Sequence, residues 1–190
     1  MDLTQWSGEN IITSVASMFA NCRSLKKLHM PNMYFSASGT SLDTFISGCC
    51  SLRDLDISNW HITRILSFNA FFNFCAALDK IDLTSWTVDS GEMTAKNTVN
   101  YTFMNCYNCK SIKIHFPLKI VTSGTVSYLF DGLYNCEYID LRNWDISVST
   151  NSNTPNLSAL TDYYPPQLYP VNQTYADAFC LTSDSLVRIL

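Results

Sequence analysis

Several features that would place this 190-residue chain in a common class of protein are missing. The longest apolar runs, such as AFF and CAAL, are far too short to span a lipid bilayer, so we predict no membrane insertion. The N-terminal stretch MDLTQWSGEN has no basic region followed by an apolar segment, and so no secretory signal. Charged residues make up only 15% of the chain, and the 12 Lys and Arg residues are scattered. This excludes the basic patch that nucleic-acid binding requires.

Catalytic signatures are missing as well. The chain has three histidines, and it contains no GxSxG, HExxH, P-loop or dinucleotide-binding motif. Asp56 and Asp82 fall in register and suggest a carboxylate pair, but solvated acids on a surface explain them more simply. We therefore predict that the protein is not an enzyme and that it holds no cofactor and no metal.

A repeated pattern of Cys, Leu and Ile is present instead. The segment CRSLKKLHM aligns with four others along the chain: CCSLRDLDI (49–57), CAALDKIDL (75–83), CYNCKSIKI (106–114) and LYNCEYIDL (133–141). The first residues of the five segments are separated by 27, 26, 31 and 27 positions. A unit of this length cannot bury its apolar face alone, whereas stacked copies share one elongated core.

The two ends of the chain carry the same pattern. MDLTQW matches LDISNW, so Met1 takes the place of Leu55, and SLVRI matches SLKKL, so Ile189 takes the place of Leu28. We therefore expect residues 1–190 to form a single solenoid that is a segment of a longer protein. The stretch 145–178 fits either an insertion loop or a degenerate repeat, and the sequence leaves both open.

The spacing within each unit predicts a β-rich solenoid of leucine-rich-repeat type. The closing positions alternate inward and outward, as in a short strand, and consecutive strands would pair as a parallel ladder. We expect about 27 residues per repeat and short helical turns only. The inward side chains should be almost fully buried and should stack in register between neighbouring units, with Leu25, Leu28 and Met30 on Leu52, Leu55 and Ile57.

The turns carry a second pattern. Residues that tolerate a left-handed backbone stand before the first position of four units, at Asn21, Gly48, Asn105 and Gly132. Phe74 departs from this pattern, so we expect the third turn to differ in shape. The Trp that follows most strands should cover the edge of the core and turn its N–H to a partner.

Most cysteines occupy repeat positions, which predicts buried, reduced thiols. The first position of the units holds Cys22, Cys49, Cys75 and Cys106, and a second inward position holds Cys109 and Cys136. The CxxC at 106–109 is then two inward positions rather than a zinc site, and some disulfide pairing is the alternative. Cys50 lies off the pattern, and we expect it to be the exposed thiol.

In the segments MFANCRSLKKLHM, CCSLRDLDISNWHIT, CAALDKIDLTSW and CEYIDLRNWDIS, the chain resembles the BspA-like leucine-rich-repeat surface proteins. Repeats of that family read approximately M-F-x-x-C-x-x-L-x-x-L-D-L-S-x-W-D-T-S-x-V. The resemblance implies a multi-repeat protein at the cell surface or outside the cell, associated with adhesion to host proteins or to other cells. It implies no catalytic residue.

The outward strand positions carry polar side chains that line up on neighbouring units. We predict that these side chains bind a protein, through a surface made of Asp54, Asp56, Lys80, Asp82, Lys113, Tyr138 and Asp140. The partner would be a host or cell-surface protein, or neighbouring copies of the chain. Reversal of Asp56, Asp82 and Asp140 to Lys should leave stability nearly unchanged and weaken attachment.

Two alternatives remain open at this point. If the contact surface lies elsewhere, the next candidate is the loop 145–175 with Tyr163, Tyr164 and Tyr169. The second alternative is that the protein is a structural spacer or an assembly component, of a surface layer or a virion, with no ligand of its own.

Overall fold

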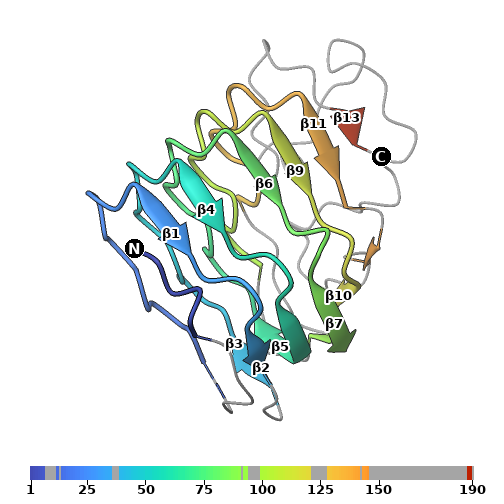
Figure 1. Ribbon diagram of the computed structural model, residues 1–190. Coiled ribbons are helices and arrows are strands. Elements are labelled where there is room, and N and C mark those ends of the chain that lie inside the picture. Colours follow the sequence, from blue (N-terminus) through green and yellow to red (C-terminus); the bar gives the residue numbers. More distant parts are fainter. Residues whose placement is uncertain are drawn as a thin grey trace.

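The chain folds as a parallel β-solenoid, and successive turns of the backbone, here called rungs, stack side by side (Figure 1). The computed structural model describes residues 1–6, 12, 14–35, 39–90, 92–93, 99–120, 128–141, 143–145 and 188–189. Leu28 pairs with Leu55, and Ile112 pairs with Ile139, 27 residues later in both cases. The predicted repeat length is therefore confirmed. The structure contains no helix within these ranges.

One side of the solenoid is a column of short parallel strands, here called the strand ladder. Its strands are β1 (Lys27–His29), β4 (Asp54–Asp56), β6 (Lys80–Asp82), β9 (Ser111–Lys113), β11 (Tyr138–Asp140) and β13 (Arg188–Ile189). The inward residue of each strand pairs with its counterpart, as in Ile81 with Ile112 and Ile139 with Ile189. The prediction of a parallel ladder is confirmed with one correction, because β4 does not pair with β6.

A second set of strands forms another side of the solenoid. These strands are β2 (Tyr34–Phe35), β3 (Thr40–Ser41), β5 (His61–Ser67), β7 (Thr87–Ser90), β8 (Glu92–Met93), β10 (Leu118–Ile120) and β12 (Trp144–Asp145). The strand β5 pairs with β2, β3 and β7, and β10 pairs with β8 and β12, all in parallel. This side therefore joins the rungs on both sides of the break in the strand ladder.

The turns between these two sides have a left-handed backbone at fixed positions. Positive φ occurs at the five positions before the Cys site, namely Asn21, Gly48, Phe74, Asn105 and Gly132. Phe74 has φ of 57°, so the expectation that the third turn differs in shape was wrong. The fold imposes this conformation on Phe74 although a bulky residue rarely adopts it.

Backbone hydrogen bonds link every pair of neighbouring turns described. The amides bond to carbonyl oxygens of the next rung in the pairs Asn21 to Ser47 (2.6 Å), Gly48 to Asn73 (2.7 Å), Phe74 to Met104 (2.9 Å) and Asn105 to Asp131 (2.7 Å). The turn side is therefore a continuous column of hydrogen bonds from Asn21 to Asp131.

Aliphatic and aromatic side chains fill the interior. Leu28, Met30, Leu52 and Ile57 are buried as predicted, whereas Leu25 and Leu55 are only partly buried. Leu55 loses cover because it lies on β4, at the break in the strand ladder. Burial of the core side chains stabilises each rung by about 1.5–3 kcal/mol for every large apolar residue.

The tryptophans cover the core edge, but not all of them in the expected way. The Nε1–H of Trp60 donates to the Met30 carbonyl (2.6 Å), and that of Trp86 donates to the Ile57 carbonyl (2.7 Å). Their rings stack with centroids 4.8 Å apart. Trp144 is buried, and its Nε1 has no partner among the described residues, while Trp6 is half exposed. Two of the four tryptophans therefore follow the prediction.

The buried thiols explain why Cys recurs in the repeat. Cys49, Cys75 and Cys106 are fully buried, and each Sγ–H donates to a carbonyl oxygen of the preceding rung, at 3.1, 3.3 and 3.1 Å. Cys109 and Cys136 are buried too, which confirms the prediction for five of the cysteines. Cys180 lies outside the described residues.

Two cysteines lie at the surface. Cys50 is exposed, as predicted. Cys22 is exposed as well, which corrects the prediction that it is buried. It belongs to the first Cys-containing rung, where no thiol of an earlier rung covers it.

Candidate protein-binding surface

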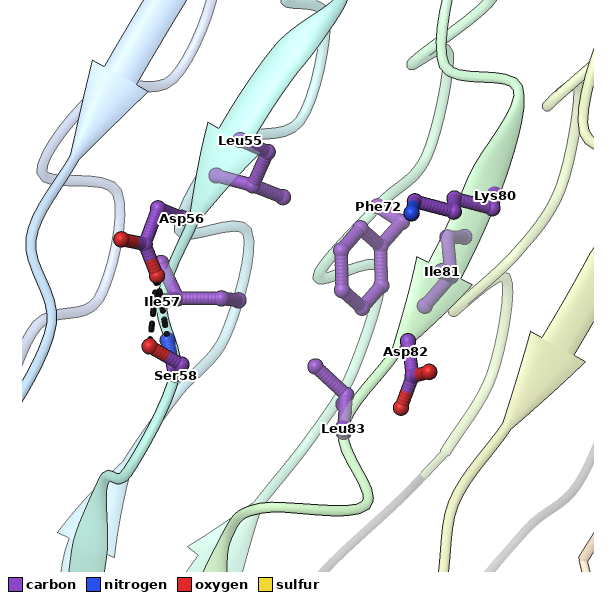
Figure 2. A pocket seen from close by; sticks show the side chains of 9 residues that line it. All are labelled: Leu55, Asp56, Ile57, Ser58, Phe72, Lys80, Ile81, Asp82 and Leu83. Carbon is purple, nitrogen blue, oxygen red and sulfur yellow. Dashed lines mark hydrogen bonds between the residues drawn. The ribbon is translucent and has the colours of Figure 1, made fainter.

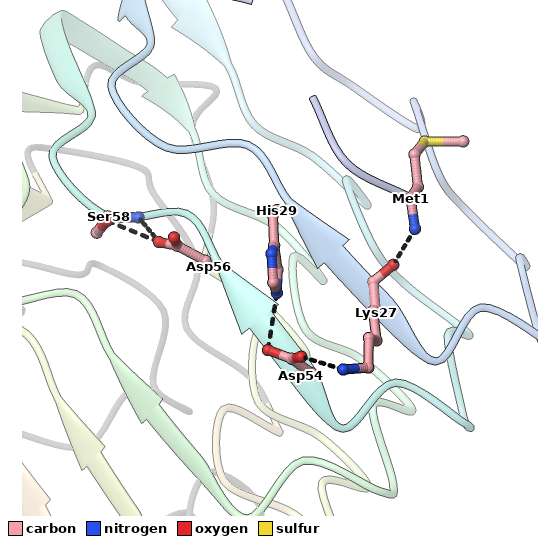
Figure 3. Close-up of polar contacts among 6 residues, drawn as sticks. All are labelled: Met1, Lys27, His29, Asp54, Asp56 and Ser58. Atoms are coloured by element: carbon pink, nitrogen blue, oxygen red, sulfur yellow. Dashed lines mark hydrogen bonds and ion pairs between the residues drawn. The ribbon is translucent and has the colours of Figure 1, made fainter. Parts of the chain in front are cut away.

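The outward side chains of β1, β4, β6, β9 and β11 form one surface, here called the strand face. At its N-terminal end, Asp54 accepts from two neighbours on β1 (Figure 3). Its Oδ2 lies 3.0 Å from Lys27 Nζ, and its Oδ1 lies 2.8 Å from His29 Nε2. The hydrogen bonds from His29 and Lys27 lower the pKa of the Asp54 carboxyl, so this carboxylate is already engaged within the strand face.

Asp56 and Asp82 have a different local role. Asp56 Oδ1 accepts from the backbone N–H of Ser58 (3.1 Å) and from its hydroxyl (2.6 Å), as Figure 3 shows. Asp82 Oδ1 accepts in the same way from Thr84, at 3.0 and 2.7 Å. This side-chain turn ends each strand, because the carboxylate satisfies the amide two residues later. Each carboxylate is bonded to the strand end through its Oδ1.

The charge of Asp82 is maintained by its surroundings. Burial raises the pKa of the Asp82 carboxyl, but the hydrogen bonds from Thr84 and the charges of Lys113 and Lys80 outweigh this effect and lower the pKa. Asp82 is therefore ionised at neutral pH.

At the C-terminal end of the strand face, the predicted residues contact one another. Lys113 Nζ lies 5.6 Å from the centroid of the Tyr138 ring, in a cation–π arrangement. Asp140 is only 1% exposed, and its Oδ2 lies 3.0 Å from His115 Nε2. We expected Asp140 to be exposed, and this was wrong. Its reversal to Lys would bury an unpaired cation, so the expected small effect on stability does not hold for this residue.

The break between β4 and β6 divides the strand face. At the other interfaces, one hydrogen bond enters each strand from the neighbouring rung, as from Arg53 N to Lys26 O (3.0 Å) and from Lys110 N to Asp79 O (2.7 Å). The equivalent bond from Asp79 N to Arg53 O is not formed. At the other interfaces, a second hydrogen bond forms just after the strand, as from Met30 N to Asp56 O (2.7 Å). Its equivalent between β4 and β6, from Ile57 N to Asp82 O, is not formed either. The two strands thus face each other without pairing.

A cleft of about 90 Å³ occupies this break (Figure 2). It is lined by apolar side chains at depth and by polar ones towards solvent: Leu55, Ile57, Phe72, Ile81 and Leu83, with Asp56, Ser58, Lys80 and Asp82. The lining comes from β4 and the residues after it on one side, and from β6 and Phe72 on the other. The cleft therefore combines apolar side chains with polar and charged ones.

The cleft is closed at both of its ends. On the turn side, Gly48 N bonds to Asn73 O, and beyond the strands Thr87 N bonds to Trp60 O (2.9 Å). Because the two rungs are bonded to each other on both sides of the cleft, the position of the cleft is fixed. The break is therefore a local opening in an otherwise joined stack.

The structure thus brings three of the seven predicted surface residues together at the cleft, namely Asp56, Lys80 and Asp82. Asp54 turns to β1, while Lys113, Tyr138 and Asp140 lie beyond β6. The apolar lining could not be predicted from the sequence, because Leu55, Ile57 and Ile81 match the inward positions of every other unit. The tyrosines of the loop 145–175 lie outside the described residues.

The described part of the chain also bears on metal binding and membrane insertion. That part contains no group of three or more His, Cys, Asp or Glu side chains placed to hold a metal ion. Within the same ranges, no helix has the length and apolar character needed to cross a membrane.

Comparison with known proteins gives one match. The model of a family described as "Mycoplasma protein of unknown function, DUF285" matches residues 1–110. No curated protein and no solved structure matches the chain. Because the matched residues cover more than half of the chain, it belongs to the DUF285 family.

Proposed function

We propose that this chain is a non-catalytic protein-binding module, an adhesion module of the BspA-like leucine-rich-repeat type, that acts at the cell surface or outside the cell. The observation that carries the proposal is the strand face, a flat surface of short strands interrupted by a cleft with an apolar interior. Solenoids use such extended surfaces for protein partners. The partner is a host or cell-surface protein, and it contacts the strand face around Asp56, Lys80 and Asp82.

The test compares two variants with the same change in net charge. In the first, Asp56 and Asp82 are replaced by Lys on the strand face. In the second, Asp89 on β7 and Asp131 on the turn side are replaced by Lys, away from the strand face. Beads coated with each protein are added to cultured epithelial cells, and attached beads are counted.

We expect the strand-face variant to attach about tenfold less well than the wild-type protein, because electrostatic complementarity with the partner is lost. The matched variant should attach normally, and cells stripped of surface proteins by trypsin should not bind the wild-type beads. Thermal unfolding of each variant shows that it is folded. Equal attachment by both variants would contradict the proposal, and clumping of beads without cells would identify neighbouring copies as the partner.

A further inference from the structure

The chemistry of the cleft between β4 and β6 is mixed in a specific way. Leu55, Phe72 and Ile81 give it apolar walls. Asp56 and Asp82 are among its lining residues, and each carboxylate has one oxygen bonded within its own strand end. The opening is therefore rich in oxygen atoms, and its interior is apolar.

Backbone carbonyls add to the oxygen atoms at the opening. Where the strands pair, the carbonyl before each strand and the carbonyl of its last residue accept an N–H from the neighbouring rung. Lys26 O and Lys113 O are examples, and the equivalent carbonyls at the cleft are those of Arg53 and Asp82. Across the cleft these two carbonyls accept nothing from the facing strand, because β4 and β6 do not pair. A ligand with several N–H donors would satisfy them.

The volume of the cleft and the charges of its lining residues indicate which kind of group can bind in it. A volume of about 90 Å³ is too small for a helix or a ring system of drug size, but it holds part of one long side chain. An apolar stem would lie against Leu55 and Ile81, and a cationic group would lie at the carboxylates. Arginine and lysine have this composition, since they bury their methylene stem and keep the charged group at the surface.

The chain itself supplies an example of this chemistry. Figure 2 shows the side chain of Lys80 extending from β6 towards the cleft that it lines. Its charge is one of the causes that lower the pKa of Asp82. Lys80 is exposed, so a side chain from outside can displace it.

We infer that the cleft binds one basic side chain, arginine or lysine, presented by an extended segment of the protein partner. The methylene stem contacts Leu55 and Ile81, and the cation lies at the carboxylate of Asp82, where it replaces Lys80. This inference rests on the proposed function, and it names the group on the partner that the strand face recognises.

The test uses a defined probe, the blocked peptide acetyl-Thr-Val-Arg-Val-Thr-amide, added to the ¹⁵N-labelled chain. We expect saturable shifts of the amide signals of Leu55 and Ile81. The control peptide carries citrulline, which has the shape of arginine without its charge, and it should bind at least about tenfold more weakly. Absence of saturable shifts, or equal affinity for both peptides, would overturn the inference.

Substitutions in the chain give a second, independent measurement. Asp56→Asn combined with Asp82→Asn removes both charges but keeps an oxygen that accepts from Ser58 and Thr84, so the strand ends remain intact. This variant should bind the arginine peptide about tenfold more weakly. The matched control is Asp2→Asn, because Asp2 Oδ1 accepts from Thr4 N (2.9 Å) in the same way but lies away from the cleft. Lys80→Gln should strengthen binding about threefold, because the competing cation is removed.

One more variant separates this inference from the proposed function. Leu55→Phe fills the cleft and leaves the charges of the strand face in place. In the bead assay, the Lys reversals reduce attachment if the strand face binds the partner, whether or not the cleft is used. The inference would be refuted if Leu55→Phe and the Asp56→Asn, Asp82→Asn variant attached normally while the Asp56→Lys, Asp82→Lys variant did not. The proposed function would still stand in that case.

Discussion

The buried cysteines show how a single residue type stabilises the repeat. At the first Cys site of the unit, each buried thiol donates to the carbonyl three positions before the equivalent site of the preceding rung, at Phe19, Ile46 and Phe72. The same carbonyl accepts the amide of the Cys in its own rung, as Phe72 O accepts from Cys75 N (2.9 Å). A small apolar residue with one weak donor fits this position, which explains the recurrence of Cys without any metal or disulfide.

Burial of these thiols predicts loss of stability at alkaline pH. Burial raises the pKa of Cys49 and Cys136 to about 11 and that of Cys106 to about 12, from an ordinary 9.0. The folded protein keeps these protons when the unfolded chain has released them, so stability is complete below pH 9 and falls as the pH rises towards 11–12. Each thiol contributes a decrease of about 1.4 kcal/mol per pH unit in the free energy of unfolding.

Urea unfolding at pH 7, 9 and 10 measures this decrease. Cys75→Ala is the informative variant, because burial raises the pKa of Cys75 well above its ordinary value. Its decrease per pH unit should be smaller than that of the wild-type protein by the contribution of one thiol. Cys50→Ala, at an exposed position, should show the wild-type decrease, and an identical pH dependence of all three proteins would contradict the assignment.

The turns are the elements in which sequence and structure agree most closely. In two places an Asn before the Cys site is followed by a Gly at the same position of the next rung, and a Cβ at Gly48 would lie 2.6 Å from Asn21 Oδ1. The same relation holds at Gly132, where a Cβ would lie 2.7 Å from Asn105 Oδ1. The Asn of one rung thus uses the space that the Gly of the next rung leaves open.

Gly48→Ala tests this relation. The new Cβ would approach Asn21 Oδ1, and φ of +77° is a conformation that Ala adopts only with strain. We expect the free energy of unfolding to fall by about 1–2 kcal/mol, measured in urea. Adding Asn21→Ala should recover part of the loss by removing the oxygen, and a neutral Gly48→Ala would contradict the assignment.

The strand elements show what the sequence predicted and what it could not. Parallel pairing, repeat length and inward positions follow from the spacing of Leu and Ile, and the polar residues at the cleft follow from their alternation. The break between β4 and β6 does not follow, because CCSLRDLDI and CAALDKIDL carry the same pattern on its two sides. The burial of Asp140 was missed for a similar reason. Its position in the unit equals that of the exposed Asp82, and only its contacts differ.

At the scale of the whole molecule, the stack is joined on the turn side and open at one place on the strand side. Backbone amides should report this difference directly. The amides of Ile57 and Asp79 form no backbone hydrogen bond across the break, whereas the equivalent amides of Met30 and Lys110 bond to the neighbouring rung. We expect Ile57 and Asp79 to exchange hydrogen for deuterium at least about tenfold faster than Met30 and Lys110. Equal protection at the four positions would show that β4 and β6 pair in solution.

The continuous turn side and the open strand side also determine how the molecule responds to mechanical force. Tension along the axis of the stack loads the interfaces between rungs in series, so each interface carries the same force. The interface between the rungs of β4 and β6 lacks strand-ladder hydrogen bonds, so there the force falls on the turn-side bonds and on the pairing of β5 with β7. Under shear flow between two attached surfaces, we expect the strand face to open there first, while the hydrogen bond from Gly48 N to Asn73 O and the pairing of β5 with β7 hold the two halves together.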